Sequence, residues 1–270
     1  MESLFTQEFL SKLPRVSVAD PARWLLENKV RTYNQEVGQD DGTGIHCARC
    51  RDKGWEAYIP EGEQRMVIRP CRCGKRRRVA LRLRECGLLE AARRCTLESF
   101  ETKSPFQATM KGLAEDFLRQ PEPGWLALCG QSGAGKTHLC TAVFVRLVAD
   151  RDLDGDYMLW GPALRRIKTE LWQGSDRLLE RYKQAELLYV DDLFKAEASA
   201  PMKDQDLRLS FELLDYRYSR RLPTILSTER TLSQLLALDE AMAGRIRERC
   251  GKYILNIEPA QGRNYRAKLR

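Results

Sequence analysis

The sequence predicts an α/β protein whose larger part is a three-layer αβα domain, with a parallel sheet between two layers of helices. From about Phe106 onward, short apolar strands alternate with helices, which is typical of a parallel sheet covered on both faces. One strand–helix junction carries GQSGAGKT, a full match to the phosphate-binding pattern G-x-x-x-x-G-K-[ST]. Ahead of this part, helical patterns and paired cysteines predict a small helical and zinc-binding N-terminal region.

That N-terminal region divides by motif into a helical segment, residues 1–40, and a cysteine module with a basic helix, residues 41–98. A first helix is expected in SLFTQEFLSKL, whose apolar residues follow a helical stripe. A second is expected in PARWLLENKVRTYNQEV, because Asp20 can cap it and Pro21 suits a first helical turn. Short strands are expected at WEAYIP and RMVIRP, and TLESFETKSP is expected to be a polar connector.

Residues 99–270 are expected to form the αβα domain. Its first helix is expected in FQATMKGLAEDFLRQ, and its strands in WLALC, YMLW, LLYV, LPTILS and KYILNI, with helices between them. Parallel strands end at one edge of a sheet, so the polar residues that follow these strands should lie close together.

Composition and charge limit the class of protein. The chain has 270 residues, of which 43% are hydrophobic and 31% charged. It holds no apolar run near the roughly 18 residues that a membrane helix needs. The first residues lack the basic start and apolar core of a signal peptide. We therefore expect a cytoplasmic protein that does not bind membranes.

The formal net charge of +8 is concentrated between Arg69 and Arg84, where eight residues are basic and none is acidic. Such a block suits a polyanion such as nucleic acid. The alternative is a solvated helix face that binds nothing. The candidate residues for nucleic acid or a partner protein are Lys75, Arg76, Arg77, Arg78, Arg82 and Arg84.

Four of the nine cysteines have metal-binding spacing. A CxxC pair and a CxC pair lie 20 residues apart, and their members are Cys47, Cys50, Cys71 and Cys73. Four thiolates complete the tetrahedral set that zinc prefers and leave no open position, so the zinc should be structural. Gly54 and Gly74 follow the pairs, where the turns are expected to need positive φ. The remaining cysteines are expected to be core residues: Cys86, Cys95, Cys129, Cys140 and Cys250.

The phosphate-binding loop is expected to hold ATP. Its glycines let backbone N–H groups face the phosphates, and the following helix adds its positive dipole end. Lys136 should reach the β- and γ-phosphates, and the Thr137 hydroxyl should bind Mg²⁺. The expected ATP-binding residues are Gly130, Gln131, Ser132, Gly133, Ala134, Gly135, Lys136, Thr137 and His138.

Two further strands end in candidate catalytic residues. LLYVDD delivers two carboxylates, of which Asp191 should bind Mg²⁺ and Asp192 should polarise the attacking water. After LPTILS, Thr228 is expected to contact the γ-phosphate or the attacking water and to cap the following helix.

Three late arginines are candidate catalytic residues that stabilise charge. Arg245 and Arg249 lie four residues apart on one helix, and Arg266 follows the last strand. The guanidinium fork matches phosphate oxygens and can act in trans on a neighbouring subunit. Any one of them could equally be a solvated surface residue.

These parts, in this order, resemble the AAA+ ATPases of the DnaC/DnaI helicase-loader and IstB type, from roughly Phe100 to the C-terminus. The resemblance implies a P-loop AAA+ core without a helical lid. It implies Walker B roles for Asp191 and Asp192, sensor 1 for Thr228 and sensor 2 for Arg266. It also makes Arg249, with Arg245 nearby, the candidate arginine finger. HCARCRDKGW and RPCRC look like the zinc motifs of DnaI-type and phage or mobile-element loaders.

Two residues depart from that pattern. Asp192 stands where many AAA+ proteins have Glu, and Thr228 stands where the loaders usually have Asn. Both departures predict slow hydrolysis and leave nucleotide binding intact.

The resemblance implies a function for the whole chain. ATP binding would assemble subunits around single-stranded DNA, the N-terminal region would hold a DnaB-type hexameric replicative helicase, and hydrolysis would release it. An alternative is an IstB-like helper of transposition that binds duplex DNA. A small-molecule kinase would share the phosphate loop, but would need an acceptor pocket.

Overall fold

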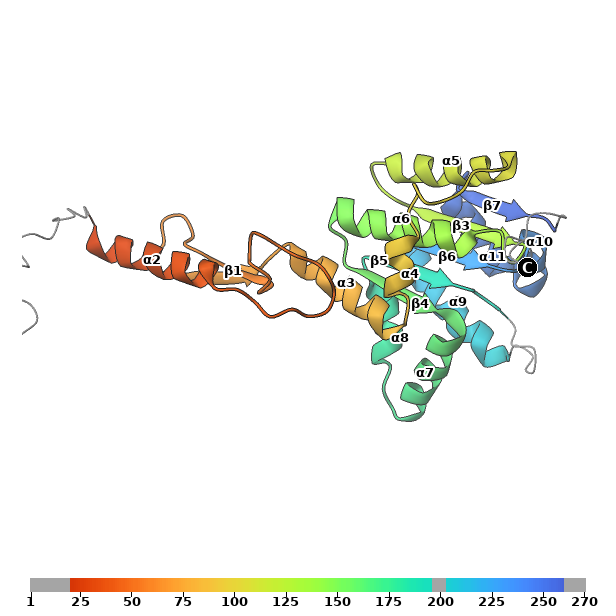
Figure 1. Ribbon diagram of the computed structural model, residues 1–270. Helices are drawn as coiled ribbons and strands as arrows, with labels where there is room; N and C mark the ends of the chain where they lie inside the picture. The colour runs from red at the N-terminus through yellow and green to blue at the C-terminus, as the bar shows by residue number, and fades with distance from the viewer. Residues whose placement is uncertain (1–19, 196–202, 260–270) are drawn as a thin grey trace, which may run out of the picture. The chain divides into compact units, whose positions relative to one another are not determined.

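The computed structural model describes residues 20–195 and 203–259 (Figure 1). The chain divides into two compact units, Met1–Gly74 and Lys75–Arg270. This division by contact differs from the division by motif into 1–40, 41–98 and 99–270, because the basic helix belongs mostly to the second unit. None of the described helices combines the length and apolarity that crossing a membrane requires.

The first unit contains one described helix and a β-hairpin. Helix α2 (Pro21–Gln35) begins as expected, with the Asp20 carboxylate accepting from the backbone N–H of Arg23 at 3.0 Å. Strands β1 (Trp55–Tyr58) and β2 (Val67–Pro70) are antiparallel. Asn34 of α2 exchanges hydrogen bonds with both backbone groups of Ala57, which joins the helix to β1. The helix expected in SLFTQEFLSKL lies outside the described residues.

The second unit contains a parallel five-stranded sheet, which confirms the fold class. Its strands, in the spatial order β4-β5-β6-β3-β7, are all parallel. Their bounds are β3 Trp125–Gly130, β4 Gly155–Leu159, β5 Leu187–Asp191, β6 Thr224–Thr228 and β7 Ile254–Ile257. Since β3 lies between β6 and β7, the phosphate loop after β3 has a strand end on each side.

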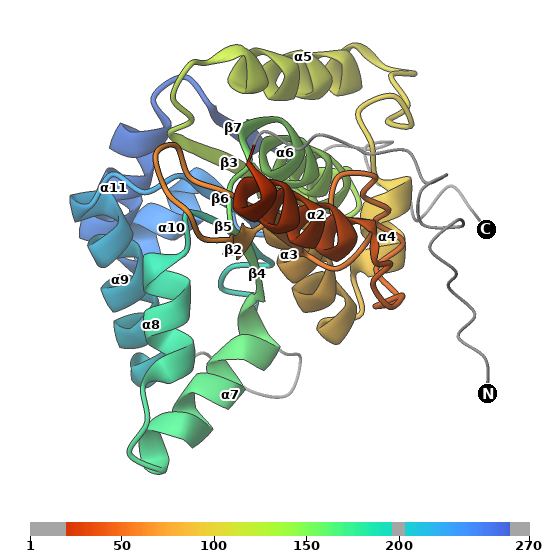
Figure 2. The same ribbon diagram turned by 90° about the vertical axis from the view of Figure 1, so that its left-hand side faces the viewer.

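Helices cover both faces of this sheet, with α5 and α6 on one side and α8, α9 and α11 on the other (Figure 2). The helix bounds are α3 Cys73–Glu85, α4 Leu89–Arg94, α5 Pro105–Arg119, α6 Lys136–Arg151, α7 Trp160–Trp172, α8 Arg177–Gln184, α9 Asp204–Ser219, α10 Leu232–Leu238 and α11 Glu240–Cys250. In the part of the chain that the structure describes, no helix follows β7.

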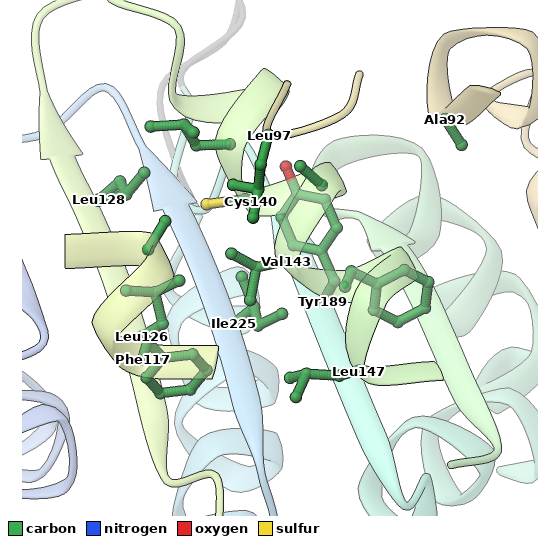
Figure 3. Close-up of a cluster of buried hydrophobic side chains, with 14 of the residues drawn as sticks. Ala92, Leu97, Phe117, Leu126, Leu128, Cys140, Val143, Leu147, Tyr189 and Ile225 are labelled. Carbon is green, nitrogen blue, oxygen red and sulfur yellow. The ribbon is translucent and has the colours of Figure 1, made fainter. Parts of the chain in front are cut away.

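The two faces of the sheet bury two separate hydrophobic clusters. Leu126 and Leu128 of β3 point into the cluster that contains α5 and α6 (Figure 3). Trp125 and Ala127 alternate with them and point into the cluster formed with α7 to α11. Every residue of β3 is buried, so this strand reads as a continuous apolar run in the sequence.

The segment before α5 differs from the expected polar connector. Leu97 and Phe100 are buried in the cluster with α6, and the short helix α4 precedes them. Polar residues in the same turn concealed this apolar pair in the sequence. The expectation that Cys86 is a core residue is also wrong, because Cys86 is exposed. Three other cysteines are buried as expected, namely Cys129, Cys140 and Cys250.

The basic helix α3 is bound to the second unit by its own charges. Lys75 pairs with Glu186 at 3.0 Å, and both Arg78 and Arg82 pair with Asp154, at 2.9 and 2.8 Å. Arg76 donates to the carbonyl oxygen of Ala149, and Val79, Leu83 and Arg77 are buried. Much of this charge is therefore paired within the chain, and a contact with nucleic acid or a partner stays a prediction.

A buried guanidinium fixes the second helical layer to the sheet. Arg217 of α9 has 0% exposure, and its Nε donates to Thr224 of β6 at 3.0 Å. Its terminal nitrogens donate to four carbonyl oxygens, those of Tyr182, Lys183, Ala185 and Pro223. The carbonyls that end a helix have no partner within it, so Arg217 satisfies the end of α8.

We predict that Arg217→Ala lowers the free energy of unfolding by about 3–5 kcal/mol, because it leaves buried carbonyls without donors. Denaturant unfolding of the variant measures this loss. Arg208→Ala, an exposed arginine on the same helix, is the control and should change stability by less than about 0.5 kcal/mol. Equal stabilities of the two variants would contradict this role.

Candidate nucleotide and zinc sites

The phosphate loop joins the end of β3 to the start of α6. Gly130 has φ +100°, and a Cβ there would lie 2.1 Å from the carbonyl oxygen of Ile257. Gly135 has φ +93°, and a Cβ there would lie 2.8 Å from the ring of Phe100. Both positions therefore require glycine. The same Ile257 oxygen accepts from the N–H of Gln131 at 2.9 Å, so β7 helps to shape the loop.

Lys136 lies inside this loop. Its Nζ donates to the carbonyl oxygens of Gly130 and Gln131, both at 2.7 Å. Burial lowers its pKa from the ordinary lysine value, while the carboxylates of Glu229 and Asp192 oppose that shift. A triphosphate would give this buried cation anionic partners in place of neutral carbonyls, which favours phosphate binding.

The carboxylate of Asp191, at the end of β5, accepts three hydrogen bonds. Thr137 of α6 donates to Oδ1 at 3.2 Å, and Ser227 of β6 donates to the same oxygen. Tyr157 of β4 donates to Oδ2 at 3.1 Å. Burial first, and then the negative charge of Asp191, raises the pKa of Tyr157, so it remains a donor.

Thr137 and Asp191 fit a magnesium site. Mg²⁺ prefers oxygen ligands and binds few protein groups directly beside phosphates and water. The adjacent hydroxyl and carboxylate oxygens supply such a donor set, and Asp191 is 3% exposed. Tyr157 and Ser227, which the sequence did not single out, fix the orientation of the carboxylate.

Asp192 lies next to a cation and a second acid. Its φ is +56°, and its carboxylate pairs with Lys195 at 2.9 Å. Lys195 also pairs with Glu229 at 3.2 Å, and Glu229 accepts from the hydroxyl of Ser132 in the phosphate loop at 2.7 Å. Neither Lys195 nor Glu229 stands out in the sequence by itself. The position of Glu229 just after β6 is the signal that could have identified it.

Thr228 contacts the backbone. Its buried hydroxyl donates to the carbonyl oxygen of Leu193 at 2.6 Å and accepts from the N–H of Arg230 at 3.1 Å. The expectation that Thr228 caps the following helix is wrong, because Thr231 is the N-cap of α10. A role at the γ-phosphate stays a prediction.

The candidate arginines differ in their surroundings. Arg245 pairs with Asp215 at 2.8 Å and lies over the ring of Phe211, 5.0 Å from its centroid. Arg249 is in the last turn of α11, and its buried Nε has no hydrogen-bond partner among the described residues. Arg249 therefore has fewer side-chain interactions among the described residues than Arg245. Arg266 lies outside the described residues.

His138, the last expected ATP-binding residue, contacts the segment before α5. Its Nε2 lies 2.8 Å from the carbonyl oxygen of Thr96, and its ring meets the ring of Phe100 edge-on at 5.3 Å. This histidine fastens the start of α6 to the Leu97–Phe100 turn. Direct contact with nucleotide stays a prediction for it.

The four spaced cysteines of the first unit converge. The sulfur atoms of Cys47, Cys50, Cys71 and Cys73 lie within 4.8 Å of one another. The Cys47–Cys71 and Cys50–Cys73 sulfurs are 3.8 and 3.4 Å apart. A tetrahedral zinc with bonds of about 2.3 Å sets its sulfur ligands about 3.8 Å apart, so this cluster fits zinc.

Backbone N–H groups favour the thiolate form of Cys47, which is the form that binds a metal. Burial alone would raise the pKa of the Cys47 thiol, but the backbone N–H groups of Cys50 and Arg49 bring it down to about 7. Gly54 has the expected positive φ of +77°, and its N–H donates to the sulfur of Cys50 at 3.3 Å. The same expectation for Gly74 is wrong, because Gly74 lies in the first turn of α3.

We predict that Cys71→Ser removes bound zinc and unfolds the first unit, because three thiolates cannot close the tetrahedral site. Zinc content by mass spectrometry and limited proteolysis of residues 20–74 measure the two effects, while thermal unfolding of the second unit should not change. Cys86→Ser, at an exposed cysteine outside the cluster, should keep zinc. Full zinc content in Cys71→Ser would contradict the assignment.

We predict that Tyr157→Phe raises the Mg²⁺ concentration needed for half-maximal ATP binding by about tenfold, because Asp191 loses the donor that orients it. Titration of Mg²⁺ against a fluorescent ATP analogue measures the shift. Tyr253→Phe is the matched control, since the Tyr253 hydroxyl donates at 3.1 Å to Asp116 of α5, which is not part of the magnesium site. The same shift in both variants would argue against a specific role.

Comparisons with known proteins agree with this fold. The chain is 30% identical over 231 residues to the phage-like element PBSX protein XkdC of Bacillus subtilis, a match that covers 82% of this chain and 86% of that protein. The fold is also similar to the crystal structure of the DnaC helicase loader, with a TM-score of 0.51 and 20% identity, over 63% of this chain and 99% of that chain. DnaI gives a TM-score of 0.51 and 24% identity, over 65% of this chain and 93% of that chain.

At these identities the two structures establish the fold alone, an AAA+ P-loop core. The family is established by a model described as IstB-like ATP binding protein, which matches residues 68–270. That range contains the phosphate loop, Asp191 and Asp192, and all five strands of the parallel sheet. The chain therefore belongs to the family of IstB-like ATP-binding proteins.

Proposed function

We propose that this protein is an ATP-dependent loader that places a replicative, DnaB-type hexameric helicase on single-stranded DNA. The observation that carries the proposal is the first unit with its four-cysteine cluster. Most of this unit precedes the residues 68–270 that match the IstB-like family model, although Cys71 and Cys73 lie inside that range. The match to XkdC covers 82% of the chain and so includes part of that unit. In this proposal the first unit binds a partner protein, and the second unit binds and hydrolyses ATP. Such a division suits a protein that holds a partner and then releases it.

In this proposal ATP is bound and hydrolysed by the groups at the carboxyl ends of β3, β5 and β6. Lys136 would bind the terminal phosphates. Thr137 and Asp191 would hold Mg²⁺, which would neutralise phosphate charge. Asp192 orients and deprotonates the attacking water. Its carboxylate also pairs with Lys195 at 2.9 Å.

The second half of the site comes from a neighbouring subunit. Arg249 has an Nε without a partner among the described residues, whereas Arg245 is bound to Asp215. An arginine that reaches the γ-phosphate of the next subunit would make assembly depend on ATP. In this scheme ATP drives assembly on single-stranded DNA, and hydrolysis in the cytoplasm releases the helicase.

A second function is supported by the family itself. A helper of transposition that binds duplex DNA would use the same residues 68–270, which are the part matched by the IstB-like model. The two functions differ in the partner and in the form of DNA, so both can be measured directly.

We predict that Lys136→Ala abolishes tight ATP binding, whereas Arg249→Ala binds ATP and loses assembly-dependent hydrolysis. Lys136 acts within its own site, and Arg249 acts in trans. Mixing the two variants should restore part of the activity, because each supplies the half that the other lacks. Phosphate release and an ATP-analogue titration measure both steps. Absence of rescue would place Arg249 outside the neighbour's site.

The loader function predicts that Asp192→Ala, which should keep ATP bound, retains a hexameric helicase in a pull-down and prefers single-stranded over duplex DNA. Lys136→Ala is the control and should retain neither. Preferential binding to duplex DNA, with a transposase and no helicase in the pull-down, would favour the helper function.

A further inference from the structure

Two acids and two lysines form an alternating cluster beside the phosphate loop. Lys195 pairs with Asp192 at 2.9 Å and with Glu229 at 3.2 Å. The pKa of the buried Lys136 responds to the same two carboxylates. Asp192 and Glu229 follow the ends of β5 and β6, and both carboxylates contact Lys195.

Glu229 is fixed in this arrangement by the phosphate loop itself. It accepts from the Ser132 hydroxyl at 2.7 Å, and its side chain is 33% exposed. Burial alone would raise the pKa of Glu229, but Ser132 and Lys195 lower it below the ordinary value, so the group is ionised at neutral pH. A carboxylate held against a phosphate-binding loop would repel a triphosphate unless a cation neutralises it.

ATP binding changes the balance of charge in this cluster. Lys136 is the loop lysine, and bound phosphates add negative charge that it must offset together with Asp192 and Glu229. Lys195 then remains as the cation that contacts both carboxylates. Its side chain is 42% exposed, so its effect is that of a partly screened ion pair and not of a buried one.

We propose that Lys195 is a positioning residue of the ATP site: it pairs with Asp192 and Glu229 together, and thereby offsets the negative charge of both acids beside the γ-phosphate. The inference rests on the proposed ATP site and assigns a selectivity to it. The γ-phosphate adds negative charge near these carboxylates that ADP does not carry. Lys195 therefore favours ATP over ADP.

The test compares the dissociation constants of fluorescent ATP and ADP analogues for the full-length chain and its variants. Lys195→Met should weaken ATP binding by roughly two- to fivefold and ADP binding by less. Adding Glu229→Gln should restore ATP binding, because the substitution removes one negative charge while its amide oxygen can still accept from Ser132. Lys168→Met is the matched control, since Lys168 pairs with Asp206 at 2.6 Å on α7 and α9.

Each outcome decides the proposal. ATP selectivity that is lost in Lys195→Met and regained in the double variant, with Lys168→Met unchanged, supports it. Unchanged ATP binding in Lys195→Met, an equal loss for ATP and ADP, or no rescue by Glu229→Gln would overturn it. Lys136→Ala separates the two levels: if that variant also binds ATP normally, the proposed ATP site itself fails.

Discussion

The carboxylate of Asp191 is the point at which the site depends on the whole sheet. Its three donors come from α6, β4 and β6, and Asp191 itself ends β5. The hydrogen bonds form only when the strands are in register and α6 begins directly after the loop. A shift of one residue in β5 would turn Asp191 to the other face and leave the three donors unpaired. The geometry of the candidate site is therefore a consequence of strand register.

Much of this arrangement could be predicted from the sequence. The parallel sheet, the phosphate loop and the position of Asp191 follow from apolar strands with polar ends, because parallel strands bring their ends together. The cysteine spacing likewise predicted the cluster that fits zinc. Each of these signals is local or repeats with a fixed period, so it survives without knowledge of tertiary contacts.

The partners of these groups could not be predicted in the same way. Tyr157, Ser227 and Lys195 are identified by what they contact, and nothing in their spacing marks them. Glu229 alone is marked by its position just after β6. Thr228 and Ser227 are adjacent, and only the alternation of β6 determines which hydroxyl faces Asp191. The sequence alone suggests that the charges of the basic helix are unpaired. They are partly paired, with Asp154 and Glu186, which lie far away in the sequence.

The close approach of Ile257 to Gly130 has a consequence for how the protein is made. Gly130 and Gln131 lie near the middle of the chain, but the carbonyl group that shapes the loop belongs to a strand near its end. During synthesis the glycine-rich motif leaves the ribosome about 125 residues before that strand, at the roughly 5–20 residues per second typical of translation. For those seconds the nascent chain carries the phosphate motif without the edge strand that shapes it. The loop can take its final shape only after β7 has emerged and paired with β3.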